Sequence, residues 1–430
     1  MKNQQFKFIH SADLHLDSPF QGLQKSCNAP VEKLRGATRK ALENLLSLAI
    51  REQVEFVLIA GDVYDGDWQD YQTGLFFRRQ MLELQKHGIE VYLIHGNHDA
   101  KSEITRHIRM PANVHTFASG AAESKQHRAL PITIHGRSFP SRAVENNFAI
   151  SYPQATNGHF NIGLLHTSLV GSNAHDTYAP CSESDLASKD YNYWALGHIH
   201  IPQIVNRQPY IVYSGNTQGR HVREAGERGC WLVSVESDHA VELEYKSLDV
   251  VRWASVEVDI SGVCEEADID TRVADEVMSL VQSAGGRLVA LRVILVGKTT
   301  LHHSLHANEQ QFFANITAAL QEFGDDKVWL EKVVFKTTRE QALESIAERN
   351  VLSAAVIGSV RKELESAPLA NSNLEQSTLP KEVRDMLKLL PADVNRQVLD
   401  DLQGDSGAEL MNEVQALVLA SLDVDAGEPA

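Results

Sequence analysis

The feature that most constrains the fold is a pattern in the first half of the chain, where short apolar runs alternate with longer segments of helical periodicity. The segments between the first three runs, residues 31–53 and 72–88, carry apolar residues at helical spacing. The apolar runs cover residues 6–11, 55–60, 90–95, 161–166 and 192–197. Short apolar runs predict buried strands, and strands that alternate with helices predict an α/β fold with parallel strand pairs.

Each apolar run ends at, or within three residues of, side chains that can bind a metal ion. One such motif alone would be unremarkable, but five consecutive strand ends are not explained by chance. Ligands of α/β sheets bind beyond the carboxyl ends of the strands, so we expect these side chains to meet at one edge. The candidates are Asp13, His15, Asp62, Asp65, Asn97, His98, Asp99, His166, His198 and His200.

The chemistry of this set indicates which ions it can hold. Carboxylates, an amide oxygen and imidazoles without any thiolate suit Mn²⁺, Fe²⁺ or Zn²⁺. The set is too large for one tetrahedral site and predicts two ions. Two neighbouring ions activate water and neutralise the charge of a phosphate, which indicates phosphoryl chemistry.

Composition narrows the class of protein. The chain has 430 residues, which predicts two or three domains, and a net charge of −17, which argues against coating nucleic acid by general basicity. Its four cysteines form no CxxC pair, so we expect a protein of the reducing cytoplasm. No run approaches the roughly 20 apolar residues that cross a bilayer, and no membrane association is expected.

Three regions are expected along the chain. Residues 1–248 contain the metal motifs and would form the catalytic domain, and residues 249–338 show a β-α-β-α-β pattern that predicts a small α/β cap domain. Residues 339–430 are helical in pattern and hold eight Lys and Arg against seventeen Asp and Glu. This acidic region is either a surface that binds a partner or a solvated helical appendix.

The motifs also resemble a known family. Asp-x-His at 13–15, Gly-Asp-x-x-Asp at 61–65, Gly-Asn-His-Asp at 96–99, a lone His166 and Gly-His-x-His at 197–200 resemble, in this order, the calcineurin-like metallophosphoesterases. The segments SADLHLDSPFQGL and YSGNTQGRHVREAGERG are similar to the YhaO-like DNA repair exonuclease branch, which is related to the nuclease SbcD. The resemblance implies a sandwich of two central sheets flanked by helices.

The resemblance further implies a role for each motif residue. Four residues would surround one ion: Asp13, His15, Asp62 and His200. Four would surround the other, with Asp62 bridging: Asp62, Asn97, His166 and His198. His98 would be the general acid beside the scissile phosphate, and Asp99 would orient its ring. Asp65 is either a supporting carboxylate or a turn residue.

The resemblance implies a DNA exonuclease, alone or with endonuclease activity, that uses two divalent ions, with Mn²⁺ favoured over Fe²⁺, Zn²⁺ or Mg²⁺. DNA, an SbcC-like coiled-coil ATPase and a second copy of the chain are the expected partners. A small-nucleotide phosphodiesterase or phosphatase is one alternative. Another is a structural head that anchors a partner ATPase.

DNA binding would have to be local in so acidic a chain. Residues 100–145 carry seven Lys and Arg against three acids and follow the Gly-Asn-His-Asp motif directly. A second basic cluster follows the turn at residues 214–216. Such side chains would contact phosphates without reading the base sequence, although ordinary surface charge is an alternative. The candidates are Arg106, Arg109, Arg137, Arg142, Arg220 and His221.

Overall fold

The computed structural model describes residues 5–18, 30–65, 71–101, 108–169, 178–324 and 326–339. Contacts divide the chain into two compact units, which are considered separately below. The first unit contains residues 1–255, 279–292 and 323–331, and the second contains the remainder. The predicted limits at 248 and 338 stay a prediction, and the acidic region beyond residue 339 lies outside the described residues.

The first six-stranded sheet carries the three amino-terminal strands in its middle. Its order is β12 (Val241–Ser247), β11 (Gly229–Val235), β1 (Phe6–Ser11), β2 (Phe56–Ala60), β3 (Glu90–Ile94) and β4 (Val114–Thr116). Strands β1 to β4 run parallel, whereas β11 pairs antiparallel with β1 and β12 with β11. The carboxyl ends of β1, β2 and β3 therefore lie at one edge.

The second six-stranded sheet has the same character. Its order is β5 (Glu123–Gln126), β6 (Ile132–Gly136), β7 (Phe160–His166), β8 (Tyr193–Gly197), β10 (Tyr210–Tyr213) and β9 (Gln203–Arg207). Strands β6, β7, β8 and β10 are parallel, and the two edge strands are antiparallel. The ends of β7 and β8 thus supply the remaining motif residues.

Aromatic side chains fill the space between the two sheets. The rings of Phe8 and Phe56 stack with centroids 5.1 Å apart, and Tyr193 of the second sheet meets Phe8 edge-on at 5.4 Å. All three are fully buried. This interface fixes the position of each strand end, because fully packed aromatic rings leave the sheets little freedom to slide.

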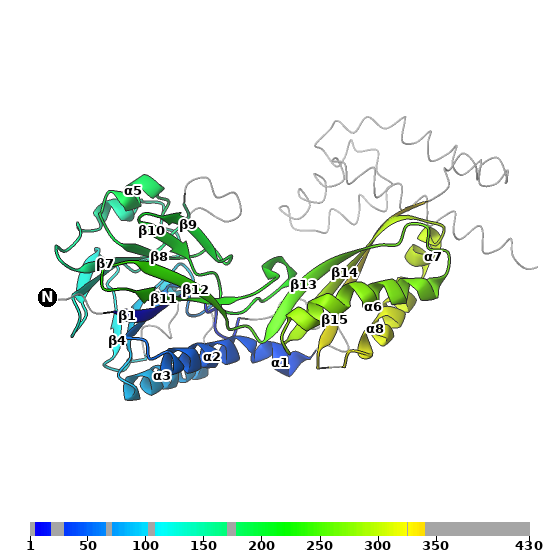
Figure 1. Ribbon diagram of the computed structural model, residues 1–430, viewed down its shortest axis with the longest axis horizontal. Helices are drawn as coiled ribbons and strands as arrows, with labels where there is room; N and C mark the ends of the chain where they lie inside the picture. The colour runs from blue at the N-terminus through cyan, green and yellow to red at the C-terminus, as the bar shows by residue number, and fades with distance from the viewer. Residues whose placement is uncertain are drawn as a thin grey trace, which may run out of the picture. The chain divides into compact units, whose positions relative to one another are not determined.

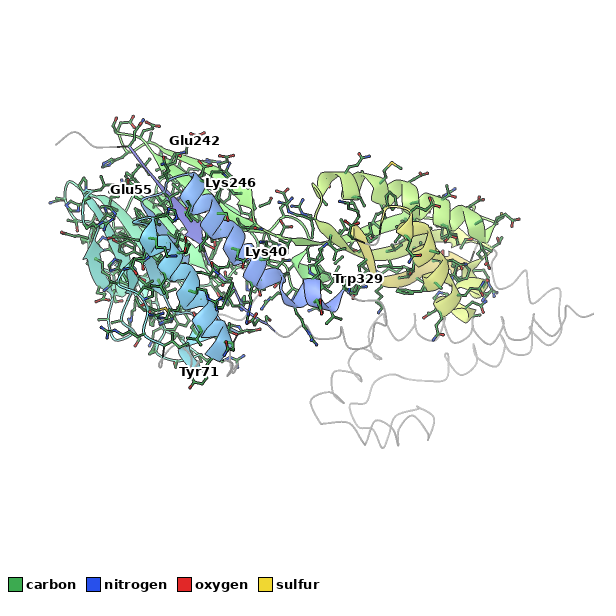
Figure 2. The ribbon with its side chains drawn as sticks, turned by 90° about the horizontal axis from the view of Figure 1, so that it is seen from below. Lys40, Glu55, Tyr71, Glu242, Lys246 and Trp329 are labelled. Carbon is green, nitrogen blue, oxygen red and sulfur yellow. The ribbon has the colours of Figure 1, made fainter. Side chains whose placement is uncertain are left out.

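Helices and loops cover the outer faces of the sandwich. Helices α2 (Ala37–Arg51) and α3 (Tyr71–Lys86) lie side by side over the first sheet, as Figure 1 shows and as Lys40 and Tyr71 mark in Figure 2. Leucines and Phe77 join them to the sheet. The second sheet is covered by loops and the short helix α5 (Glu183–Ala187). The predicted sandwich of two sheets flanked by helices is confirmed.

A third sheet confirms the predicted β-α-β-α-β pattern. It consists of β13 (Val251–Asp259), β14 (Leu288–Thr299) and β15 (Val328–Arg339), with helices α6 (Glu266–Ser283), α7 (His302–Ala307) and α8 (Glu309–Gln321) in the connections. Its strands are shared between the two compact units. None of the helices in the described ranges is long and apolar enough to cross a membrane.

Candidate metal centre

Unusual backbone geometry directs the motif side chains toward one another. Asp13, His15, Asp62 and His198 have φ values of 52°, 42°, 53° and 95°, in the left-handed region that few residues other than glycine adopt. Each lies in the turn that follows a parallel strand. The tight turns bring ligands from β1, β2 and β8 to the same edge of the sandwich.

A first group of ligand atoms is formed by Asp13, His15 and His200, which lie within 4.8 Å of one another. Nε2 of His15 is 3.2 Å from Nε2 of His200. Asp13 and His15 are almost fully buried, and Nδ1 of His15 has no hydrogen-bond partner among the described residues. Two imidazole nitrogens that face each other beside a buried carboxylate fit a divalent cation between them.

A second group consists of Asp13, Asp62 and His166, again within 4.8 Å. Nε2 of His166 lies 2.9 Å from Oδ1 of Asn97 and 3.4 Å from Oδ2 of Asp62. Nδ1 of His166 donates to the carbonyl of Ala60 at 2.9 Å, which leaves Nε2 for the site. The two groups share Asp13, so the bridging role that the resemblance implies for Asp62 stays a prediction.

The carboxylates of the second group are compensated by the neighbouring imidazole. Burial would lower the pKa of the His166 imidazole, but the neighbouring Asp62 and Asp13 carboxylates raise it to about 9. Burial also raises the pKa of the Asp13 carboxyl to about 6, against the pull of His200 and His166. The imidazolium therefore supplies positive charge where a divalent ion would otherwise supply it.

His198 lies beside these groups without joining either. Its ring centroid is 5.2 Å from that of His166, and its backbone N–H donates to the Asp13 carboxylate at 3.0 and 3.2 Å. The structure thus brings all seven predicted ligand residues to one edge of the sandwich. Their individual assignment to two ions stays a prediction.

His98 borders the ligand groups. Its ring centroid is 5.0 Å from that of His15, and its Nδ1 lies 2.8 Å from Oδ1 of Asp65. Burial lowers the pKa of the His98 imidazole, but the Asp65 and Asp62 carboxylates outweigh this effect and the pKa is raised. A raised pKa favours the protonated ring that a general acid requires.

The ring of His98 lies against Asp65, and the orienting role that the resemblance implies for Asp99 stays a prediction. The Asp99 carboxylate accepts hydrogen bonds from the backbone N–H groups of Val63, Tyr64 and Gly96 at 3.1, 2.9 and 3.2 Å. It therefore joins the turn after β2 to the turn after β3. This is a structural role that keeps two ligand-bearing turns together.

Glu224 is a further residue of the site that the sequence did not reveal. Its buried carboxylate accepts a hydrogen bond from Nδ1 of His200 at 2.7 Å. Burial alone would raise the pKa of this carboxyl, yet His200 and Arg220 hold it well below its usual range. No motif spacing marks Glu224, and its position on the short helix η4 (Val222–Glu224) depends on the tertiary structure.

The candidates for DNA binding fall into different surroundings. Arg106 lies outside the described residues, whereas Arg109, Arg142 and His221 are exposed. The guanidinium of Arg137 lies over the Phe148 ring at 3.8 Å and donates to the carbonyls of Ser119 and Gly120, both at 3.2 Å. These contacts explain Arg137 as a structural residue and argue against its predicted phosphate contact.

Arg220 also points inward. Its side chain is 16 % exposed, its Nη2 donates to Oε1 of Glu224 at 2.9 Å, and its Nη1 lies 3.7 Å from Oδ2 of Asp65. A guanidinium held by two carboxylates is not free to follow a DNA strand. Arg220 therefore supports the site rather than extending its surface.

Comparison with known proteins decides the family. The calcineurin-like phosphoesterase family matches residues 6–202, and the middle domain of metallophosphoesterase YhaO matches residues 253–338. An uncharacterized metallophosphoesterase, YhaO of Bacillus subtilis, is 35 % identical over 319 residues, which cover 71 % of this chain and 77 % of that protein. The chain is a calcineurin-like metallophosphoesterase. The resemblance inferred from the motifs is confirmed.

Two more distant relatives of this metallophosphoesterase have names that refer to DNA repair or nuclease activity. The DNA double-strand break repair protein Mre11 of Methanopyrus kandleri is 24 % identical over 299 residues, covering 62 % of each chain. A component of the nuclease SbcCD of Bacillus subtilis is 24 % identical over 263 residues, covering 51 % of this chain and 63 % of the relative. As a member of its family, the metallophosphoesterase is a metal-dependent phosphoester hydrolase.

Proposed function

We propose that this metallophosphoesterase is a DNA exonuclease with endonuclease activity, dependent on two divalent ions. The observation that carries the proposal is the meeting of two largely buried ligand groups with His98 at the carboxyl ends of β1, β2 and β3 of one sheet and β7 and β8 of the other. Oxygen and nitrogen ligands favour Mn²⁺, with Fe²⁺, Zn²⁺ and Mg²⁺ as alternatives.

The metal ligands and His98 would have different chemical roles. Bound ions of this kind lower the pKa of a water and neutralise charge on phosphate oxygens. Seven residues would hold them: Asp13, His15, Asp62, Asn97, His166, His198 and His200. His98 would donate a proton to the departing oxygen, and Asp65, 2.8 Å from Nδ1, would keep the ring oriented and charged.

Two observations favour DNA over a small nucleotide as the substrate. The relatives that share the catalytic domain include a double-strand break repair protein and a component of a nuclease. The exposed arginines Arg109 and Arg142 would contact phosphates outside the ligand groups. His221 is also exposed, but burial of part of its ring lowers its pKa, so it would contribute a hydrogen bond rather than a charge. The relative named as part of SbcCD also supports an SbcC-like coiled-coil ATPase as the partner. The cytoplasmic location stays a prediction from the cysteines, which form no CxxC pair.

In the test, the purified protein is incubated with linear and with circular DNA, each single- and double-stranded, in the presence of Mn²⁺, Mg²⁺ or Zn²⁺. Bis-p-nitrophenyl phosphate serves as a small phosphodiester. We expect metal-dependent release of nucleotides from linear DNA and slower nicking of circles. Asp62→Asn should abolish both reactions, whereas Asp238→Asn, at an exposed turn, should change neither.

Hydrolysis of the small phosphodiester without attack on any DNA would reject the exonuclease and support the small-nucleotide alternative. If the protein binds two metal ions but hydrolyses neither DNA nor the small phosphodiester, the result would favour the alternative in which it anchors a partner ATPase and has only a structural role.

A further inference from the structure

The His200 ring is held from behind by a carboxylate. Its Nδ1–H donates to Oε1 of Glu224 at 2.7 Å, while its Nε2 faces Nε2 of His15 at 3.2 Å. A neutral imidazole that donates from Nδ1 has its lone pair on Nε2. The contact with Glu224 therefore selects the tautomer that can bind a metal on the side of the ligand groups.

Glu224 is itself fixed by further donors. Oε2 accepts from Nδ2 of Asn216 at 2.9 Å and from the backbone N–H of Arg220 at 2.8 Å. Oε1 accepts from Nη2 of Arg220 at 2.9 Å in addition to His200. Both oxygens are thus surrounded by N–H groups, and the side chain is only 6 % exposed.

The backbone around Glu224 is equally constrained. Arg228 donates from Nε to the carbonyl of Glu224 at 3.2 Å and from Nη1 to the carbonyl of His200. A Cβ atom on Gly219 would lie 2.6 Å from that same Glu224 carbonyl, so the loop leaves no space there. The carboxylate and the ring that it contacts are therefore held at a defined separation.

We propose that Glu224 is a positioning residue of the metal centre, whose carboxylate, fixed by Arg220 and Asn216, holds His200 with Nε2 directed at the ion. The inference rests on the proposed two-metal function. Carboxylates that hold a ligand histidine in this way fix its orientation and raise its basicity, and their loss typically weakens metal binding about 10–100-fold.

The variant Glu224→Gln tests the proposal with little change of shape. A glutamine has only one acceptor oxygen, so its NH₂ group would face one of the N–H donors that now surround the carboxylate. The matched control is Glu227→Gln, three residues further along, because Glu227 is exposed and pairs with Arg252 at 3.2 Å, away from the ligands.

Mn²⁺ binding to the metal-free full chain is measured by calorimetry, with thermal unfolding of each metal-free variant measured in parallel. We expect one of two Mn²⁺ sites to weaken about 10–100-fold in Glu224→Gln, the other to change little, and Glu227→Gln to match the wild type. Equal affinities in Glu224→Gln and wild type would overturn the inference. So would equal weakening of both sites together with a lower unfolding temperature, because that pattern indicates a general structural role.

A second measurement needs no variant of Glu224. In the metal-free wild type labelled with ¹⁵N-histidine at pH 8.5, the His200 signals, assigned by their loss in His200→Gln, should show a proton on Nδ1. A bare Nδ1 would overturn the inference even if Glu224→Gln does not fold. If the wild type binds no divalent ion, the proposed function fails, whereas the state of Nδ1 still tests the contact with Glu224.

Discussion

His98 is the residue at which proton transfer can be separated from metal binding. Its ring borders the ligand groups, but its Nδ1 lies 2.8 Å from Asp65 and its backbone N–H donates to Oδ1 of Asp62 at 3.0 Å. The side chain is 27 % exposed, more than the carboxylates and imidazoles of the two ligand groups, so it can reach a substrate.

We predict that His98→Gln lowers turnover on DNA by about 10²–10⁴-fold while both metal ions stay bound. The physical reason is that an alkoxide leaves slowly without a proton. The defect should shrink on bis-p-nitrophenyl phosphate, because p-nitrophenolate departs without one. Turnover on both substrates and metal content by elemental analysis check this, with His87→Gln, half-exposed at the end of α3, as the control.

A loss of metal in His98→Gln, or an equal defect on both leaving groups, would contradict the role of general acid.

At the residue scale, the sequence predicts the metal ligands but not the contacts of the residues that support them. The ligands were predictable because each closely follows a strand, and the ends of parallel strands meet wherever the strands do. The contacts of Asp65 with a ring and of Asp99 with three backbone N–H groups could not be read from the sequence, because they depend on how two turns pack. Glu224 reaches His200 across 24 residues, a contact that no local pattern encodes.

At the scale of elements, the strands were the most predictable part of the molecule. All five apolar runs form strands, since full burial on both faces requires continuous apolar sequence. The other strands of the two large sheets, β4, β5, β6, β9, β10, β11 and β12, were not predicted. The edge strands β4, β5 and β9 have no fully buried residue and carry little periodic signal, whereas β6 is buried throughout and was missed because its run of five residues is short and includes a threonine and a histidine.

Gly163 on β7 allows the second sheet to pack. It pairs with Trp194 on β8, and a Cβ atom at position 163 would lie 2.2 Å from Cε3 of that fully buried ring. We predict that Gly163→Ala lowers the free energy of unfolding by about 1–3 kcal/mol, because the indole must shift within a filled core. Urea denaturation followed by tryptophan fluorescence measures the change.

Gly120→Ala is the control, since a Cβ atom there would meet no described atom within 4 Å. Equal stability of the two variants would show that Trp194 has room to move.

At the scale of the whole molecule, charge is unevenly distributed. The protein carries −17 overall, of which residues 339–430 contribute about half with eight basic and seventeen acidic side chains. All predicted metal ligands lie between residues 13 and 200. An acidic region is a poor binder of DNA and is better suited to a basic or apolar groove on a partner.

We predict that a chain ending at residue 339 retains hydrolysis of bis-p-nitrophenyl phosphate but loses self-association or binding to an SbcC-like ATPase. Light scattering of the shortened and full chains gives their masses, and co-purification with the ATPase gives the partner affinity. The activity on the small substrate controls for correct folding. If the shortened and the full chain have the same oligomeric state and the same affinity for the ATPase, residues 340–430 do not mediate self-association or binding of the ATPase.

The left-handed backbone at Asp13, His15, Asp62 and His198 has a consequence for how such a protein would decay. Each non-glycine residue in this conformation costs about 1–3 kcal/mol, and Asp13 and Asp62 are buried carboxylates as well. At positions 15 and 198, glycine would remove the backbone strain without removing a carboxylate. At positions 13 and 62 it would also leave the His166 imidazole and the backbone N–H groups of His198 and His98 without their carboxylate partners. In a lineage that kept the protein for its shape alone, positions 15 and 198 are therefore expected to change to glycine before positions 13 and 62.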